Sequence, residues 1–94
     1  MKKTFTLDCR NIESLDEFHD EVNNVLCPEI DWYGRNWDAF NDILRGGLGT
    51  FDSDEKIKLI FKGREHVKKK LGEGFLKMFI EIVEDFDNIE LIFE

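Results

Sequence analysis

Cysteine and proline are scarce in this chain of 94 residues. The two cysteines, Cys9 and Cys27, do not form a Cys-x-x-Cys pair, so a metal site or a redox motif has little support. In a cytosolic protein we expect them to be reduced, half-buried thiols rather than a disulfide. The one proline, Pro28, follows a helical pattern and is expected to end it.

Long apolar runs are also missing. No stretch approaches the ~20 apolar residues that span a bilayer. The first three residues, Met-Lys-Lys, are typical of the start of a secretion signal, but Thr4, Thr6, Asp8 and Arg10 interrupt any apolar segment behind them. We therefore expect a cytoplasmic protein that does not contact membranes.

Positive charge is the third shortage. Lys and Arg number 13 against 21 Asp and Glu, which gives a net charge of −8. Such a surface repels nucleic acid and attracts basic proteins, although solubility alone would also explain it. The basic run Lys68-Lys69-Lys70 has no interleaved aromatic residues and is interpreted as a solvated face. The charge balance favours a cationic protein partner over DNA or RNA.

Sequence features that hold cofactors are not found. His19 and His66 lack metal-ligand spacing, and the glycine-rich segment 46–49 follows a helical pattern instead of a strand, unlike a phosphate-binding loop. We expect no cofactor and no bound metal.

Hydrophobic residues, in contrast, are plentiful, at 41% of the chain with nine Phe. This composition predicts one globular domain over residues 1–94. Ser14 and Glu17 fit a capping box at the start of the first helix. Alternating and helical periodicities predict strands at 3–7, 56–61 and 89–93, and helices at 15–26, 36–46, 65–71 and 75–86.

This order of elements predicts the fold. Strands separated by helices pair in parallel through right-handed crossovers, so we expect an α/β fold with a small three-stranded parallel sheet and helices packed on it. The apolar run that ends the segment 56–61 is typical of a strand buried on both faces. These patterns do not determine the strand order.

The segment 31–47 is the most informative part of the chain. Asn36 can cap a helix and Gly46 can stop it, and between them Asp38 and Asp42 lie four residues apart on one face. Like charges at that spacing repel, and Asp42 in the last turn is also opposed by the helix dipole. This unfavourable acidic face suggests a cationic partner. Asp38 could instead be a dipole partner, and Asp42 could pair with Arg45 on a solvated surface.

The two tryptophans in this segment are expected to differ. Trp37 lies on an apolar stripe with Phe40 and Leu44 and is predicted to be in the core, whereas Trp32 precedes the helix and is predicted to be an exposed contact.

The spacing Tyr33-Gly34-x-Asn36-x-Asp38-Ala39-x-x-Asp42-x-Leu44 resembles the barstar family of intracellular ribonuclease inhibitors. The likeness extends over nearly the whole chain and implies a barstar-like fold. It also implies a protein that inhibits a small basic ribonuclease and is not an enzyme, in which the acidic helix occupies the positions of RNA phosphates.

By the same resemblance, Asp42 would be the deepest anchor, Asp38 its neighbour, and Trp32 and Tyr33 would pack against the rim of the nuclease site. Asn41, Arg45 and Gly47 depart from the best-known member, so the identity of the nuclease stays open. The expected nuclease contacts are Trp32, Tyr33, Gly34, Asn36, Asp38, Asn41, Asp42, Arg45, Gly46 and Glu81.

The resemblance implies an immunity protein that is monomeric when free, whose target is an extracellular ribonuclease or a toxin. Two alternatives stay open. The chain could be an acidic regulatory or scaffolding module with a partner other than a nuclease. It could also be an enzyme that uses Asp38 and Asp42 as a carboxylate pair, although a helix face without a base partner rarely does chemistry.

Overall fold

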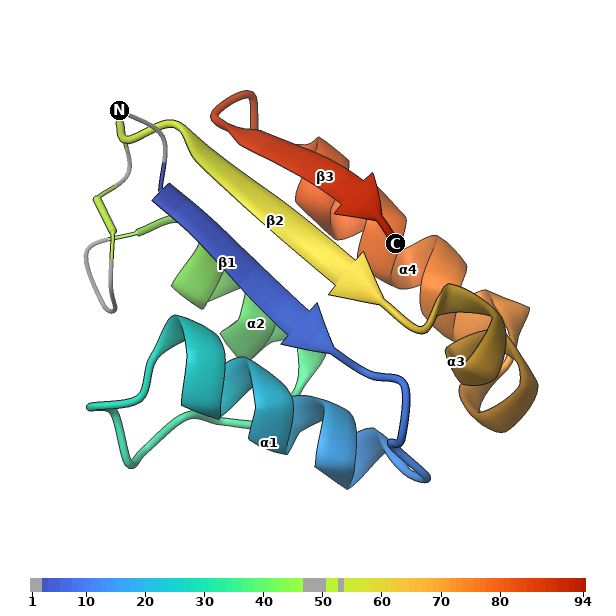
Figure 1. Cartoon of the computed structure of the whole chain (residues 1–94). Coiled ribbons are helices and arrows are strands. Elements are labelled where there is room, and N and C mark those ends of the chain that lie inside the picture. Colours follow the sequence, from blue (N-terminus) through green and yellow to red (C-terminus); the bar gives the residue numbers. More distant parts are fainter. Residues whose placement is uncertain (1–2, 47–50, 53) are drawn as a thin grey trace.

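The computed structural model describes residues 3–46, 51–52 and 54–94, and these form a small α/β fold (Figure 1). Three strands pair in parallel in the order β1-β2-β3, so the chain builds the sheet from one edge to the other. Along the described residues the elements are β1 (Lys3–Asp8), α1 (Leu15–Leu26), α2 (Trp37–Leu44), β2 (Ile57–Lys62), α3 (Arg64–Leu71), α4 (Glu73–Glu84) and β3 (Ile89–Phe93). The predicted fold class and parallel sheet are confirmed.

The core lies on one face of the sheet. The register pairs Leu7 with Phe61 and Leu59 with Leu91, so apolar side chains of the three strands form a continuous surface. Aromatic rings of the helices cover it: Phe79 of α4 lies 4.9 Å from Phe61 and 6.0 Å from Phe18 of α1, measured between ring centroids. The buried apolar residues include Phe18, Val22 and Leu26 of α1 and Leu76, Phe79 and Val83 of α4, whereas Leu15 at the start of α1 is 47% exposed.

The opposite face of the sheet is open, which corrects the prediction that the second strand is buried on both faces. Only alternate residues of β2 are buried, and Ile60 is half-buried between Lys58 and Lys62. Its neighbours across the sheet are Thr6 and Ile92, which are half-buried too. A continuous apolar run in the sequence does not distinguish a strand that helices cover on both faces from a central strand whose second face is shielded only by the neighbouring strands.

The boundaries of α1 follow the predicted signals, whereas α4 begins and ends two residues before the predicted range 75–86. Ser14 Oγ accepts a hydrogen bond of 3.2 Å from the Glu17 amide, and Glu17 Oε1 accepts one of 3.0 Å from the Glu13 amide, so the capping box satisfies two amides. Helix α1 ends at Leu26, two residues before Pro28. The interhelical segment 27–36 then leads to α2.

Candidate functional site

Helix α2 begins and ends through local interactions. Asn36 is extended at the N-cap, and its Oδ1 accepts a hydrogen bond of 2.7 Å from the Ala39 amide. After the last turn, Gly46 has φ +85°, a left-handed conformation that a glycine adopts without strain. These residues set a short helix whose acidic face is exposed.

The two carboxylates on this face are largely unneutralised. Asp42 Oδ1 lies 3.8 Å from Arg45 Nη1, and both side chains are more than half exposed, at 57% and 68%. The predicted pairing of Asp42 with Arg45 is therefore confirmed, but an exposed pair of this kind contributes only about 0–1 kcal/mol. Within the described residues Asp38, which is exposed, forms no ion pair.

A hollow of about 330 Å³ lies beside the acidic face. Six of its lining residues are among the expected nuclease contacts: Trp32, Tyr33, Gly34, Asn36, Asp38 and Asp42. Ala39 and Ile43 complete the lining and were not expected there. Their spacing of four, each one residue after an aspartate, is the signal that could have identified them.

Gly34 is packed closely against this helix. A Cβ atom added at Gly34 would lie 3.1 Å from the Ala39 Cβ, which is tighter than an ordinary contact. The glycine therefore lets the interhelical segment pass against the first turn of α2.

Other expected contacts lie outside the hollow. Asn41, Arg45 and Gly46 belong to α2 or its C-terminal end without lining it, and Gly47 lies outside the described residues. Glu81 lies on α4 and lines a different hollow of about 540 Å³ at the α3–α4 surface. The structure thus does not place Glu81 among the residues that line the acidic hollow.

The aromatic residues near the site have distinct environments. Trp32 is 65% exposed, as predicted, and Trp37 packs its ring 5.2 Å from that of Phe75 and 5.8 Å from that of Phe40. Tyr33 is only 7% exposed. Tyr33 nevertheless lines the hollow, so its small exposed surface lies on the wall that it shares with Trp32.

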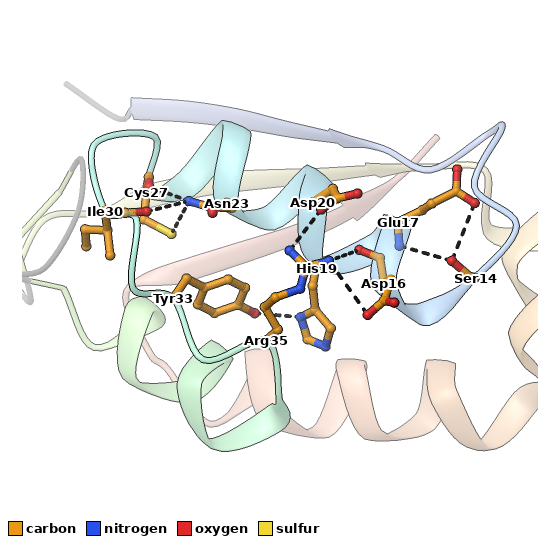
Figure 2. A network of polar contacts seen from close by, with 10 residues as sticks. All are labelled: Ser14, Asp16, Glu17, His19, Asp20, Asn23, Cys27, Ile30, Tyr33 and Arg35. Atoms are coloured by element: carbon orange, nitrogen blue, oxygen red, sulfur yellow. Dashed lines mark hydrogen bonds and ion pairs between the residues drawn. The ribbon is translucent and has the colours of Figure 1, made fainter.

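Tyr33 is buried because it bonds to helix α1. Its Oη and His19 Nδ1 share a hydrogen bond of 2.7 Å (Figure 2). Burial lowers the pKa of His19, with a smaller contribution from the Arg35 cation, and burial raises the pKa of the Tyr33 phenol. Both groups are therefore neutral near pH 7. Sequence reasoning missed this pair because a histidine among acidic residues gives no sign of which residue it will meet.

The interhelical segment has two further attachments to α1. Asn23 Nδ2 donates to the carbonyl oxygens of Cys27 at 2.8 Å and Ile30 at 3.0 Å. Arg35 Nη2 donates to the Asp16 carbonyl oxygen at 2.7 Å, and its Nη1 lies 2.9 Å from Asp20 Oδ1 (Figure 2). None of these residues was expected to matter for the site.

The two cysteines lie in the core. Cys9 and Cys27 are free thiols, and both are fully buried rather than half-buried. Burial raises the pKa of Cys9 to about 12 and also raises that of Cys27. The described residues contain no group of three His, Cys, Asp or Glu side chains that could hold a metal ion.

The basic run on α3 is exposed and partly paired with acidic side chains. Lys68, Lys69 and Lys70 are exposed, and the first and last pair with Glu73 at 3.2 Å and with Glu13 at 2.8 Å. Among the helices of the described segments, none is long and apolar enough to cross a membrane.

Comparison with known proteins assigns the family. A search of curated proteins finds no match. The family model described as barstar (barnase inhibitor) matches residues 2–91, which is nearly the whole chain. Together with the three-stranded parallel sheet and the capped acidic helix, this match shows that the chain belongs to the barstar family of barnase inhibitors.

Proposed function

We propose that residues 1–94 act as one domain that inhibits a small basic ribonuclease by covering its active site with α2. The observation that carries this proposal is the exposed pair Asp38 and Asp42 beside a hollow whose other walls include Trp32. The family match supports the inhibitory role, because the family is described by its inhibition of barnase.

The proposed mechanism is electrostatic mimicry of RNA. Arg and Lys side chains that hold phosphate in a nuclease can donate the same forked hydrogen bonds to a carboxylate. Asp42 and Asp38 would occupy such phosphate positions, while Trp32 and Tyr33 would pack against the rim of the nuclease site. Gly34, Asn36 and Gly46 would contribute close backbone or amide contacts. Asn41 and Arg45 would lie at the edge of the interface, and Glu81 would be a peripheral contact at most.

The proposed biological role is an immunity protein. It would act in the cytoplasm as a monomer and protect its host against an extracellular ribonuclease or a toxin. Binding requires no cofactor, because every interaction in the mechanism is made by side chains and backbone of the chain.

Inhibition of barnase tests this proposal. Cleavage of a fluorogenic RNA substrate by a fixed amount of barnase is measured while the protein is added, and a stoichiometric loss of activity is expected. A second basic ribonuclease recovered by pull-down from the native host would identify a different target within the same proposal. Capture of a partner without nuclease activity, with no inhibition of either enzyme, would favour the scaffolding alternative.

A further inference from the structure

Arg35 occupies an unusual position at the site. It lies between Gly34 and Asn36, which both line the acidic hollow, yet its own side chain points away toward α1 (Figure 2). Its φ of +57° is the one positive value among the non-glycine residues that the structure describes. A residue other than glycine is strained in this left-handed backbone conformation, so interactions of its side chain must hold it there.

Those interactions come from a polar stripe on α1. This stripe consists of four residues on one face of the helix, because the last three follow the first by three, four and seven positions: Asp16, His19, Asp20 and Asn23. Three members of the stripe bond to the interhelical segment. Asn23 bonds to Ile30 near the start of the segment, and His19 bonds to Tyr33 in its middle. Asp20 pairs with Arg35 at its end. Only the last attachment involves a charged pair, and it immediately precedes the N-cap of α2.

We propose that Arg35 is a positioning residue that holds the acidic face of α2 and the 32–34 segment in their binding arrangement before the nuclease arrives. This inference rests on the proposed function. A surface that is ordered in advance avoids part of the ordering entropy that association otherwise costs. Losing one such restraint corresponds to roughly three- to tenfold weaker binding.

The charge of Arg35 lets the direction of the change in affinity separate positioning from a simple charge effect. Arg35→Met keeps an unbranched side chain but removes the guanidinium, which makes the protein more negative. A simple charge effect would therefore strengthen binding to a basic nuclease. Asp20→Asn breaks the same ion pair while making the protein less negative, so a charge effect would weaken binding. Positioning by the pair predicts weaker binding for both variants.

Two matched controls separate position from charge. Asp16→Asn removes the same charge from the same helix as Asp20→Asn, but it keeps the 2.7 Å hydrogen bond from Arg35 to the Asp16 backbone and loses only a 3.8 Å contact. Arg10→Met removes an arginine from an exposed ion pair with Asp8 that does not line the acidic hollow. Both controls should bind within about twofold of the wild type, because neither removes the 2.9 Å contact between Arg35 and Asp20 that precedes α2.

The experiment measures the dissociation constant for barnase of the wild type, Arg35→Met, Asp20→Asn, their double variant and the two controls. We expect about three- to tenfold weaker binding for Arg35→Met and for Asp20→Asn. The double variant should bind no more weakly than the weaker of these two, because both substitutions break the same pair. Hydrogen exchange of the Ala39 and Phe40 amides, which donate to Asn36 Oδ1 at 2.7 Å and to the Asn36 carbonyl oxygen at 2.9 Å, should accelerate in Arg35→Met and Asp20→Asn. Exchange in β2 should be unchanged, which a global loss of stability would not produce.

The outcomes separate the two proposals. Tighter binding of Arg35→Met and weaker binding of Asp20→Asn would show a charge effect and overturn the positioning role. Wild-type affinity in both variants would overturn it as well. Absence of wild-type binding both to barnase and to any basic ribonuclease of the native host would count against the proposed function. The exchange rates of the Ala39 and Phe40 amides would still decide whether the Arg35–Asp20 pair orders the start of α2.

Discussion

Arg45 places a positive charge at the C-terminal end of an otherwise acidic helix. Its guanidinium lies 3.8 Å from Asp42, and its side chain is 68% exposed, so the pair costs little to separate. On binding, we expect Arg45 to turn outward toward an acidic or carbonyl-rich edge of its natural nuclease. An arginine facing the basic site of a barnase-like enzyme would be repelled instead.

Replacement of Arg45 should therefore change specificity. Arg45→Thr is expected to weaken binding to the natural nuclease and to strengthen binding to barnase-like enzymes. Competition between the two nucleases for each variant measures the effect. Equal affinities for both variants would place Arg45 outside the interface.

His19 gives the protein a pH-dependent stability. Because burial lowers its pKa in the folded state below the usual value of about 6.5, the unfolded chain binds more protons just below that pH. Stability should therefore fall as the pH drops from about 6.5 toward the lowered pKa of His19 in the folded state. Other charges around the imidazole come from Arg35, Asp16 and Asp20.

Thermal unfolding between pH 7.5 and 5 tests this dependence. His19→Gln keeps a hydrogen-bonding side chain for Tyr33 but does not titrate, so its unfolding temperature should change less over this range than that of the wild type. The same pH slope in both proteins would assign the effect to other groups.

Among the structural elements, β2 shows where the two faces of the sheet differ. Leu59 is fully buried in the core, whereas Ile60 is half-buried on the open face. Leu59→Ala should lower the free energy of unfolding by about 2–5 kcal/mol, because it removes buried methyl groups and leaves a cavity. Ile60→Thr should cost less than about 1 kcal/mol.

Chemical denaturation of the two variants provides the comparison. Both substitutions lie in the central strand, so each controls for the other's effect on strand formation. Similar losses of stability would mean that the open face is covered by another part of the protein.

The positions of the helices could be predicted from the sequence because the signals that start and continue a helix are local. Ser14 and Asn36 cap the amides three residues later in the chain, and the apolar stripes repeat every turn. The strand order β1-β2-β3 and the open face of β2 depend on which distant elements meet, and no local pattern encodes that choice. The attachment of the interhelical segment to α1 was missed for the same reason: Arg35 and Asp20 are 15 residues apart, with no motif linking them.

The candidate site was predictable to a similar extent. Asp38 and Asp42 share a face because of helical periodicity alone, and Trp32 is exposed because it lies outside any apolar stripe. The burial of Tyr33 could not be predicted, since it depends on the position of His19 in three dimensions. The nuclease-binding roles of these residues remain predictions.

For the whole molecule, the net charge of −8 sets the expected kinetics. Attraction between this chain and a basic nuclease should accelerate association at low ionic strength. At physiological salt the field extends only about 8 Å, so the association rate should fall markedly as salt is added. Stopped-flow measurements at several salt concentrations would show this dependence, and a rate independent of salt would argue against electrostatic guidance.

The most direct test of the account compares two aspartates near helix C-termini. Asp42 lies in the last turn of α2, and Asp85 is the C-cap of α4. Both are exposed, so Asp42→Ala and Asp85→Ala each remove one negative charge from the surface near the end of a helix. Inhibition of the ribonuclease and unfolding by denaturant are measured for both.

If Asp42 takes the place of a phosphate, Asp42→Ala should weaken inhibition by about 2–5 kcal/mol, because it strands a buried cation of the enzyme. Its stability should be unchanged or higher, since the substitution removes a like-charge repulsion and a conflict with the helix dipole. Asp85→Ala should inhibit like the wild type. Undiminished inhibition by Asp42→Ala, together with a lower stability, would show that Asp42 is structural and would contradict the account.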